Sequence, residues 1–356
     1  MKRPYHKIRP MIFWEGFPPC GLLTKRLTDA FGDDLKLLGT RAAVPFAGLD
    51  KYLTHPIRWL DVPNEIWNIR EEYADRNFII HTGWRYPGWL KFDRWMRSRG
   101  AKIVITLDNT PRWDMRQLFG SIWFRLWLRR HFDGAFVPGH ASTRLLHYFG
   151  MPPERIFTGY YGAFEQIYYP GPPVSQRSKE FLFIGQLIHR KGVDIMLEGF
   201  RKYRATGGDW GLRIMGNGPL ELMCHGEGIT FEGFGQPEYC AERMRSARCL
   251  ILMSREDHWG TVVCEAAACG TALLTSSKVG ATEDIVRPNI NGLVLHTMNP
   301  DEMCRKLQSI SSWSARQLDY AGEVSCGISK GFDSQAYLVS VLNMMESLCP
   351  PMNNKG

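Results

Sequence analysis

Apolar and polar positions follow a regular alternation along the second half of the chain. Short apolar runs that end in glycine or polar residues are typical of buried parallel strands, and stretches with helical spacing separate them. The expected strands are EFLFIG (180–185), WGLRIMG (210–216), ITFEGF (229–234), CLILMS (249–254) and TALLTSS (271–277). The expected helices are VDIMLEGFRKY (193–203), PEYCAERMRSA (237–247) and WGTVVCEAAAC (259–269). This alternation predicts an α/β fold with a doubly wound parallel sheet.

The first half repeats the alternation less regularly, with strand candidates PMIFWEGF, NFIIHTG, KIVITLD and GAFVPG. The stretch YYPGPPVSQRSKE (168–180) is rich in Pro, Gly and Ser and is interpreted as a linker. We therefore expect an N-terminal Rossmann-like domain over 1–170 and a C-terminal one over 177–325. A C-terminal helix within 326–356 is expected to pack back towards the N-terminal domain. Ligands should bind at the carboxyl ends of the strands, in the cleft between the domains.

Composition narrows the class of protein. Of 356 residues, 44% are hydrophobic and 22% charged, as expected for a globular protein with ample core. The net charge of +8 favours anionic partners such as nucleotides or an anionic membrane surface, or simply gives a basic surface. No nucleic-acid module is recognisable, so we expect no nucleic acid partner. Nine scattered cysteines without a C-x-x-C pair, no H-E-x-x-H and no D-x-D argue against disulfides and a metal site.

The chain shows no signal peptide and no apolar run of the ~18 residues that a spanning helix needs. The expected location is the cytoplasm, and peripheral attachment to the inner face of the membrane is an open alternative.

The loop after CLILMS is the strongest candidate for binding chemistry. Gly260 and Thr261 offer backbone N–H groups at the start of the following helix, where anions bind. Glu265 lies one turn further on, alone in a run of small apolar residues. A carboxylate in such a helix is costly unless it finds hydrogen-bond donors. A ligand diol would supply them; the alternative is that Glu265 pairs with a nearby Arg or caps a loop.

A second candidate is FIGQLIHRKGVD (183–194), where a strand ends at Gly185 and Arg190 and Lys191 precede a helix. Two adjacent cations there suit a diphosphate, although a solvated basic loop has the same sequence pattern. MGNGP (215–219) and FEGFGQPE (231–238) are weaker candidates: they are turns that contribute Gly216, Asn217 and Phe234, the last as a surface for a base, or that simply connect strand to helix.

Candidates in the first half are fewer. GFPPCGLLTK (16–25) fails as a P-loop because leucines stand where Lys-Ser/Thr is required, but it remains a glycine-rich loop, with Gly16, near the cleft. No G-x-G-x-x-G follows the first strand, which weakens a dinucleotide oxidoreductase. His81 and Asp108 end their strands at the same edge, and either is alternatively an ordinary structural hydrogen-bonder.

FGSIWFRLWLRRHF (119–132) is basic and amphipathic. It is either a membrane-surface helix or an ordinary helix packed on the sheet with an arginine-bearing outer face. The abundance of tryptophan, a good core residue, favours the packed helix.

Two segments resemble the donor-binding half of glycosyltransferase family 4: FLFIGQLIHRKGVDIMLEGF and EDHWGTVVCEAAACGTALLTSSKVGATEDIVRPNINGLVL. RLLHYFGMPPERIFTGYYGAFEQIYYP resembles the domain junction of that family, so the resemblance covers residues 140 to 300. It implies the GT-B fold, with two facing Rossmann-like domains around an interdomain cleft. The first part of the chain matches only in general layout and would be the acceptor-binding domain.

In that family two acidic residues eight positions apart frame the donor site. The second contacts the ribose diol and matches Glu265; the first contacts the transferred sugar and matches Asp257, which is shorter than the usual glutamate. Neighbouring Glu256 is a candidate substitute. The resemblance also implies that the amides of Gly260 and Thr261 hold sugar hydroxyls or phosphate.

The lysine of the family's phosphate motif matches Lys191, but Gln186 stands where the family has an arginine, and Arg190 is the candidate to compensate. The resemblance implies a retaining, hexosyltransferase-type enzyme that uses a UDP-, GDP- or ADP-linked sugar. Its acceptor would be a glycan or lipid-linked glycan, as in polysaccharide biosynthesis. Arg190 and Lys191 would neutralise the departing diphosphate, so neither a metal nor another cofactor is expected.

Gln186 and Asp257 keep open a non-catalytic scaffold paralogue, and the fold also admits a nucleotide-sugar epimerase or a phosphorylase. The candidate residues are, for catalysis, Arg190, Lys191 and Asp257; for the donor, Gly185, Gln186, Gly216, Asn217, Phe234, Glu256, Trp259, Gly260, Thr261 and Glu265; and for the acceptor side, Gly16, His81 and Asp108.

Overall fold

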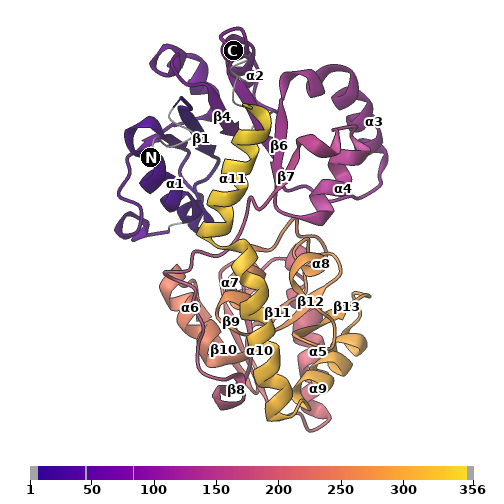
Figure 1. Ribbon diagram of the computed structural model, residues 1–356. Coiled ribbons are helices and arrows are strands. Elements are labelled where there is room, and N and C mark those ends of the chain that lie inside the picture. Colours follow the sequence, from indigo (N-terminus) through magenta and orange to yellow (C-terminus); the bar gives the residue numbers. More distant parts are fainter. Residues whose placement is uncertain (1–6, 45, 83, 351–356) are drawn as a thin grey trace. The chain divides into compact units, whose positions relative to one another are not determined.

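The chain forms two compact units in a computed structural model that describes residues 7–44, 46–82 and 84–350. Unit 1 comprises residues 1–161 together with 334–356, and unit 2 comprises Gly162–Asp333. The chain therefore passes between the units twice, after Tyr161 and after Asp333. In Figure 1 the yellow helix α11 lies among the indigo and magenta elements of unit 1. Gly83 and residues 351–356, which belong to segments interpreted above, lie outside the described residues.

The interpretation of 168–180 as a linker is wrong, because this stretch is folded into unit 2. Its anchor is Arg177, which is 6% exposed. The Arg177 guanidinium donates to the carbonyl oxygens of Met244 at 3.2 Å and Cys269 at 3.0 Å, and to the hydroxyl of Thr271 at 3.1 Å. Proline and glycine here shape an ordered path rather than a free connection.

Unit 1 is a seven-stranded sheet in the order β3-β2-β1-β4-β5-β6-β7, and all its registers are parallel. The strands are β1 Pro10–Trp14, β2 Lys36–Gly39, β3 Ile57–Trp59, β4 Phe78–His81, β5 Lys102–Thr106, β6 Gly134–Val137 and β7 Ile156–Thr158. The helices are α1 Lys25–Phe31, α2 Pro87–Arg97, α3 Met115–Trp123, α4 His140–Tyr148 and α11 Ser334–Leu348. β2, β3 and β7 were not predicted, because none of them contains more than two consecutive apolar residues and such runs carry almost no pattern.

The core of unit 1 is apolar and rich in aromatic rings. Trp89, Phe92 and Met96 of α2 are fully buried against strand residues such as Ile79 and Ile103. α11 contributes a buried stripe that includes Tyr337, Val341 and Met344, as its helical spacing requires. This packing explains why a helix at the end of the chain belongs to the first unit.

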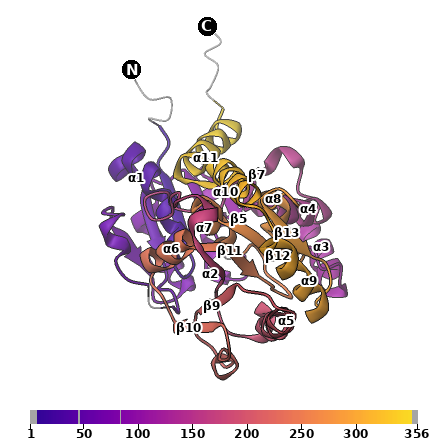
Figure 2. The same cartoon turned by 90° about the horizontal axis from the view of Figure 1, so that it is seen from below.

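Unit 2 is a six-stranded parallel sheet in the order β10-β9-β8-β11-β12-β13. Its strands are β8 Ser178–Ile184, β9 Gly211–Met215, β10 Ile229–Gly233, β11 Ala247–Leu252, β12 Ala272–Ser276 and β13 Gly292–Leu295. Its helices are α5 Val193–Ala205, α6 Pro237–Ser246, α7 Thr261–Ala268, α8 Thr282–Ile285, α9 Pro300–Ser311 and α10 Ala315–Ser329. Figure 2 shows α5 and α9 on one face of this sheet and α6 and α7 on the other. The predicted doubly wound sheet is confirmed.

The strand order of unit 2 reverses between β8 and β11. The chain first adds β9 and β10 on one side of β8, then returns to place β11 and β12 on the other. At such a switch point the loops that leave the two strands diverge and leave a crevice at their carboxyl ends. The loops after β8 and β11 are therefore the natural place to look for a site.

Among the described residues, no helix combines the length and the apolar character needed to cross a bilayer.

Candidate functional site

The loops after β8 and β11 are tied to each other by hydrogen bonds. The Arg255 guanidinium donates two bonds of 2.7 Å to the carboxylate of Asp194 and a third, of 2.6 Å, to the carbonyl of His189. The Arg255 amide donates to the carbonyl of Arg190 at 2.8 Å, and the Arg190 guanidinium donates to the carbonyl of Glu256 at 3.0 Å. The first loop therefore presents its cations on a scaffold that the second loop holds in place.

Lys191 and Asp257, which lie 66 residues apart in the sequence, are in direct contact. The Lys191 ammonium donates to Asp257 Oδ2 at 2.5 Å, and the buried hydroxyl of Ser254 donates to the same oxygen at 3.2 Å. The two charged side chains are only 15% and 10% exposed. An ammonium carries three donors, so Lys191 can bind an anion beside the carboxylate that holds it.

Gly192 allows the two loops to approach this closely. Its φ is +68°, and a Cβ built on it would lie 1.8 Å from the carbonyl oxygen of Met253 in the second loop. Only glycine, which lacks a Cβ, both adopts this backbone conformation readily and leaves space for that carbonyl. The Lys-Gly pair recognised in the sequence is therefore required by packing as well as by charge.

Helix α7 begins beside this contact, directly after Gly260. Gly260 has a φ of +82°, and a Cβ there would meet Val279 and Leu252 side chains at 2.8 and 2.9 Å. Its role is thus to fit the turn between strand and helix. The first N–H groups of α7 have no acceptor within the helix and carry the positive end of its dipole. They add to the positive field of Arg190 and Lys191.

Glu265 lies on the same side of α7 as Thr261, four residues and one turn further along. It is partly buried, and its carboxylate accepts a hydrogen bond from Tyr168. Burial raises the pKa of the Glu265 carboxyl to about 7, and the tyrosine bond opposes that rise. The protein partner of this carboxylate is a tyrosine hydroxyl rather than the arginine that the sequence suggested as an alternative.

The remaining donor candidates occupy neighbouring strand ends. Gly185 donates its amide to the Met215 carbonyl at 3.0 Å, and the Asn217 carbonyl accepts from Leu187 at 2.8 Å, so the ends of β8 and β9 are joined. Gly216 donates to the Gly233 carbonyl at 2.8 Å. Gln186 is exposed. Phe234, 37% exposed, follows the edge strand β10, which β9 separates from β8.

Trp259 does not face this group of residues. Its side chain is 2% exposed, its indole N–H donates to Cys264 Sγ at 3.3 Å, and its ring lies 5.9 Å from that of Phe332. The indole therefore fills the interior of unit 2, and only the Trp259 backbone lies in the loop. If Trp259 contributes to donor binding, as the sequence predicts, it does so through its backbone rather than its indole.

The three acceptor-side candidates lie at the carboxyl ends of the adjacent strands β1, β4 and β5 of unit 1. The Gly16 amide donates to Thr40 Oγ1 at 2.7 Å, and Tyr161 donates to Asp108 Oδ2 at 3.3 Å. His81 is fully buried; its ring stacks on Trp89 with centroids 4.3 Å apart, and its Nε2 lies 3.0 Å from Asp93 Oδ1. The structural alternative therefore holds for His81.

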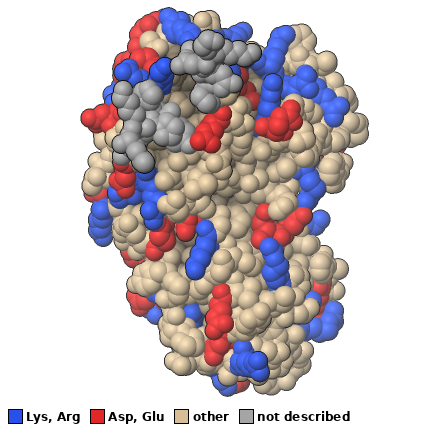
Figure 3. Space-filling model, viewed as in Figure 1, with Lys and Arg blue, Asp and Glu red and all other residues tan. Residues whose placement is uncertain are grey.

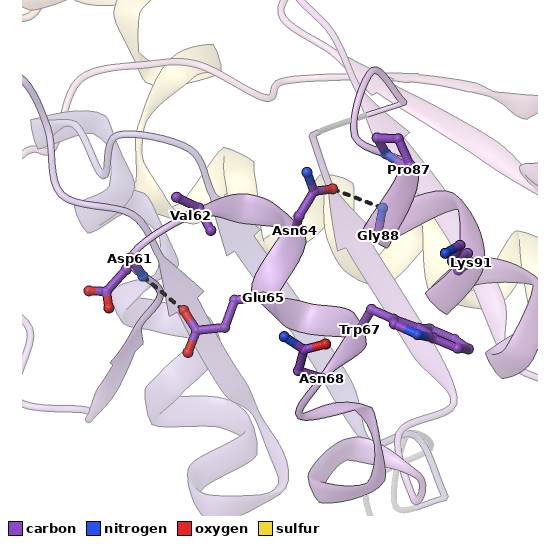
Figure 4. Close-up of a pocket in the computed structure, with 9 residues that line it drawn as sticks. All are labelled: Asp61, Val62, Asn64, Glu65, Trp67, Asn68, Pro87, Gly88 and Lys91. Atoms are coloured by element: carbon purple, nitrogen blue, oxygen red, sulfur yellow. Dashed lines mark hydrogen bonds between the residues drawn. The ribbon is translucent and has the colours of Figure 1, made fainter.

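Unit 1 also contains two hollows that the sequence did not indicate. One, of about 510 Å³, lies between the 3-10 turn Pro63–Trp67 and the start of α2 (Figure 4). Asn64 Oδ1 caps this helix start by accepting from the Gly88 amide at 2.8 Å. The other, of about 650 Å³, follows β1, β2 and β3 and is lined by Phe17, Arg41, His55 and Trp59, among others. It adjoins the predicted loop at Gly16.

Three contributors were missed. Ser254 and Arg255 lie at the start of the loop after β11, but no local pattern showed that Ser254 donates to Asp257 and Arg255 to Asp194. Tyr168 was assigned to a linker, and only its contact with Glu265 reveals a role. In the part of the chain that the structure describes, no three His, Cys, Asp or Glu side chains group closely enough to hold a metal ion; independence from metal stays a prediction.

Comparison with known proteins finds matches mainly in the second half of the chain. Residues 170–322 match the family model described as Glycosyl transferases group 1. An uncharacterized glycosyltransferase of Methanocaldococcus jannaschii is 28% identical over 153 residues, which cover 40% of this chain and 39% of that protein. D-inositol 3-phosphate glycosyltransferase 1 of Catenulispora acidiphila is 24% identical over 201 residues, or 49% and 48% of the two chains. The matched stretch thus spans less than half the length of each relative.

The fold matches over nearly the whole chain. The structure of HepE from Anabaena, solved in complex with UDP, superposes with a TM-score of 0.74 at 13% identity and covers 96% of this chain and 100% of that one. Both Rossmann-like units are therefore those of the GT-B fold. Together the matches give the chain the GT-B fold and relate residues 170–322 to the glycosyl transferases of group 1.

Proposed function

We propose that this chain is a retaining, family 4 glycosyltransferase that moves a sugar from a nucleotide-diphosphate donor to a glycan or lipid-linked glycan. The observation that carries the proposal is the Lys191–Asp257 contact at the switch point of unit 2. It joins a cation suited to phosphate with a carboxylate suited to sugar hydroxyls, within the region that matches the glycosyltransferase model.

The diphosphate would bind Arg190, Lys191 and the first turn of α7. Guanidinium, ammonium and helix N–H groups are all donors that phosphate oxygens accept. As the bond to the sugar breaks, negative charge grows on the departing diphosphate, and preorganised donors stabilise that charge more than they stabilise the ground state. The rigid link between the two loops through Arg255 keeps these donors in place.

Asp257 and Glu265 would recognise the two sugars of the donor. Lys191 would donate to the diphosphate while it keeps its bond to Asp257 Oδ2, and Asp257 Oδ1 would accept from a hydroxyl of the transferred sugar. Glu265, with its neighbour Tyr168, would accept from the ribose diol. A carboxylate with a raised pKa gains from two such donors, because they stabilise its charged form.

The reaction would proceed on one face of the sugar. The bond between the anomeric carbon and the diphosphate oxygen breaks, and its electron pair leaves with the diphosphate. The acceptor hydroxyl oxygen then bonds to the anomeric carbon from the same side, and its proton passes to the departing phosphate oxygen. This course needs no protein nucleophile and no metal, since the cations of unit 2 neutralise the leaving group.

The test is a thermal-shift screen followed by turnover. Binding to the folded state raises its stability by about 2.7 kcal/mol at a ligand concentration of 100 Kd. UDP-glucose is the first ligand to test, because HepE structures contain UDP and UDP-glucose, and GDP- and ADP-sugars follow. Product NMR then reports the anomeric configuration; an inverted product would refute retention.

Two controls separate the alternatives. Lys191→Ala should lose turnover, whereas Lys179→Ala, at an exposed lysine paired with Asp209, should not. Donor binding without turnover on any acceptor would indicate a scaffold, and a changed sugar on the same nucleotide would indicate an epimerase.

A further inference from the structure

Helix α3 and the turns that follow it carry apolar residues on two opposite faces. α3 continues through a π-helical turn, Phe124–Leu128, and a 3-10 turn, Arg129–His131. Ser121, Phe124 and Leu128 point to the core and are buried. The opposite side exposes large apolar side chains, here called the aromatic face: Trp113, Met115, Leu118, Phe119, Ile122, Trp123, Leu126 and Trp127.

The faces of this helix differ from the packed-helix interpretation, in which the outer face bears arginines. Phe119, Trp123 and Trp127 are 65%, 51% and 56% exposed, so the aromatic rings face solvent. Arg125 and Arg129, expected on the outer face, are exposed, and they also donate to the carbonyls of Tyr148 at 2.6 Å and Gly150 at 3.1 Å. These two arginines fasten the helix to the end of α4.

The aromatic face is unusual within this molecule. Of eighteen exposed large apolar side chains among the described residues, eight lie in this one segment. Single exposed apolar residues are normal on soluble proteins, whereas a contiguous group marks an interaction surface. The segment therefore needs an occupant.

The charges around the face select that occupant. Residues 112–131 contain five arginines and one acidic residue, Asp114. Arg116 is exposed, and Arg130 lies over the Trp127 ring with its guanidinium 5.8 Å from the centroid. Figure 3 shows tan and blue side chains over the part of unit 1 where Figure 1 has α3. A second copy of this chain would bring two such basic rims together, which like-charge repulsion opposes.

We propose that the aromatic face docks unit 1 on an anionic membrane surface. The helix would lie in the plane of the interface, with its rings in the boundary between headgroups and acyl chains and its arginines against lipid phosphates. Tryptophan suits that depth because one end of the indole is apolar and the other donates a hydrogen bond. The proposal is independent of sugar transfer.

Vesicle flotation tests it with the full chain. The probes are vesicles of phosphatidylcholine alone and of phosphatidylcholine mixed with phosphatidylglycerol. The wild type should bind the anionic vesicles, and Phe119→Ser/Trp123→Ser should lower the partition coefficient by about tenfold or more, since two apolar side chains no longer enter the interface. Leu222→Ser, at a 91% exposed leucine of unit 2, is the matched control and should bind as the wild type does.

A charge variant tests the part of the proposal that places arginines against lipid phosphates. Arg116→Glu should weaken binding to anionic vesicles more in low salt than in high salt, because exposed charges are screened by salt. Arg125 and Arg129 are less suitable for this test, since their substitution would also remove hydrogen bonds to the end of α4. Circular dichroism and Tm check that each variant folds; Phe119→Ser alone replaces the double variant if that one does not.

Three results would overturn the proposal. One is a wild type that binds neither vesicle in low salt, and another is equal binding by wild type and double variant. The third is a sedimentation experiment in which the wild type is a dimer, the double variant a monomer and neither binds lipid, because a second copy would then occupy the face.

Discussion

Replacing Glu265 by glutamine should make the protein more stable and a weaker nucleotide binder. The charged carboxylate lies in a site that disfavours it, as its pKa of about 7 against an ordinary 4.5 indicates. At 1.36 kcal/mol per pH unit, the difference corresponds to about 3 kcal/mol of lost stability when the group is charged. Glutamine keeps the shape, and its amide oxygen can still accept from Tyr168, but it carries no charge.

The sign follows from the raised pKa. Below pH 4.5 the carboxyl is protonated in both the folded and unfolded states, so its ionisation has no effect on stability. As pH rises from 4.5 through about 7, the unfolded chain ionises first and the folded state loses relative stability, fully so above pH 7. The gain of Glu265→Gln should therefore be near zero at pH 4 and reach about 3 kcal/mol at pH 8.

Binding should change in the opposite direction. Ribose hydroxyls donate to the charged carboxylate, so wild-type affinity for UDP should rise as pH increases through 7. Loss of charged hydrogen bonds costs about 2–3 kcal/mol, or about a 30- to 150-fold weaker Kd, at pH 8. The variant should show no such dependence on pH.

Thermal unfolding at pH 4 and pH 8 and calorimetry with UDP measure both effects. A domain of this size shifts its Tm by ~2–4 °C per kcal/mol, so the variant should melt about 6–12 °C higher at pH 8. A variant whose Tm equals that of the wild type at both pH 4 and pH 8 would refute the burial assigned to Glu265. An unchanged affinity for UDP in a folded variant would make Glu265 structural.

Three further predictions concern the same unit. Lys191→Ala should lower kcat/KM by about 10²- to 10³-fold with an unchanged far-UV spectrum, and turnover equal to wild type would remove Lys191 from the mechanism. Turnover should survive dialysis against excess EDTA; loss that Mg²⁺ or Mn²⁺ restores would instead make Glu256 and Asp257 metal ligands. Gly192→Ala should destabilise the fold by about 2–4 kcal/mol in urea, because its Cβ would meet the Met253 carbonyl. Gly207→Ala, also at positive φ but with nothing within 4 Å, is the control and should cost only about 1–2 kcal/mol; equal losses would mean that strain alone matters.

Much of unit 2 could be predicted because its information is local. Five of its strands are apolar runs that end in glycine or polar residues, and α5, α6 and α7 show helical spacing. In unit 1, β2, β3 and β7 gave no such signal, since each has at most two consecutive apolar residues and is formed by pairing with a neighbouring strand. The boundary was misplaced because the proline- and glycine-rich stretch around Arg177 is held by residues far along the chain.

By itself, the sequence determined where the candidate site of unit 2 lies: at Lys191 and Gly192 after one strand, and at an acidic loop with Glu265 one helical turn beyond another. Only the tertiary structure decided that Lys191 meets Asp257, that Tyr168 is the partner of Glu265 and that Trp259 turns inward.

The same limit applies to α3. The sequence indicated a basic, amphipathic helix, but apolar residues lie on both of its sides, and no local rule says which side will be buried. That choice rests on shape: the narrow stripe of Ser121, Phe124 and Leu128 fits against the core, and the broad aromatic face stays outside.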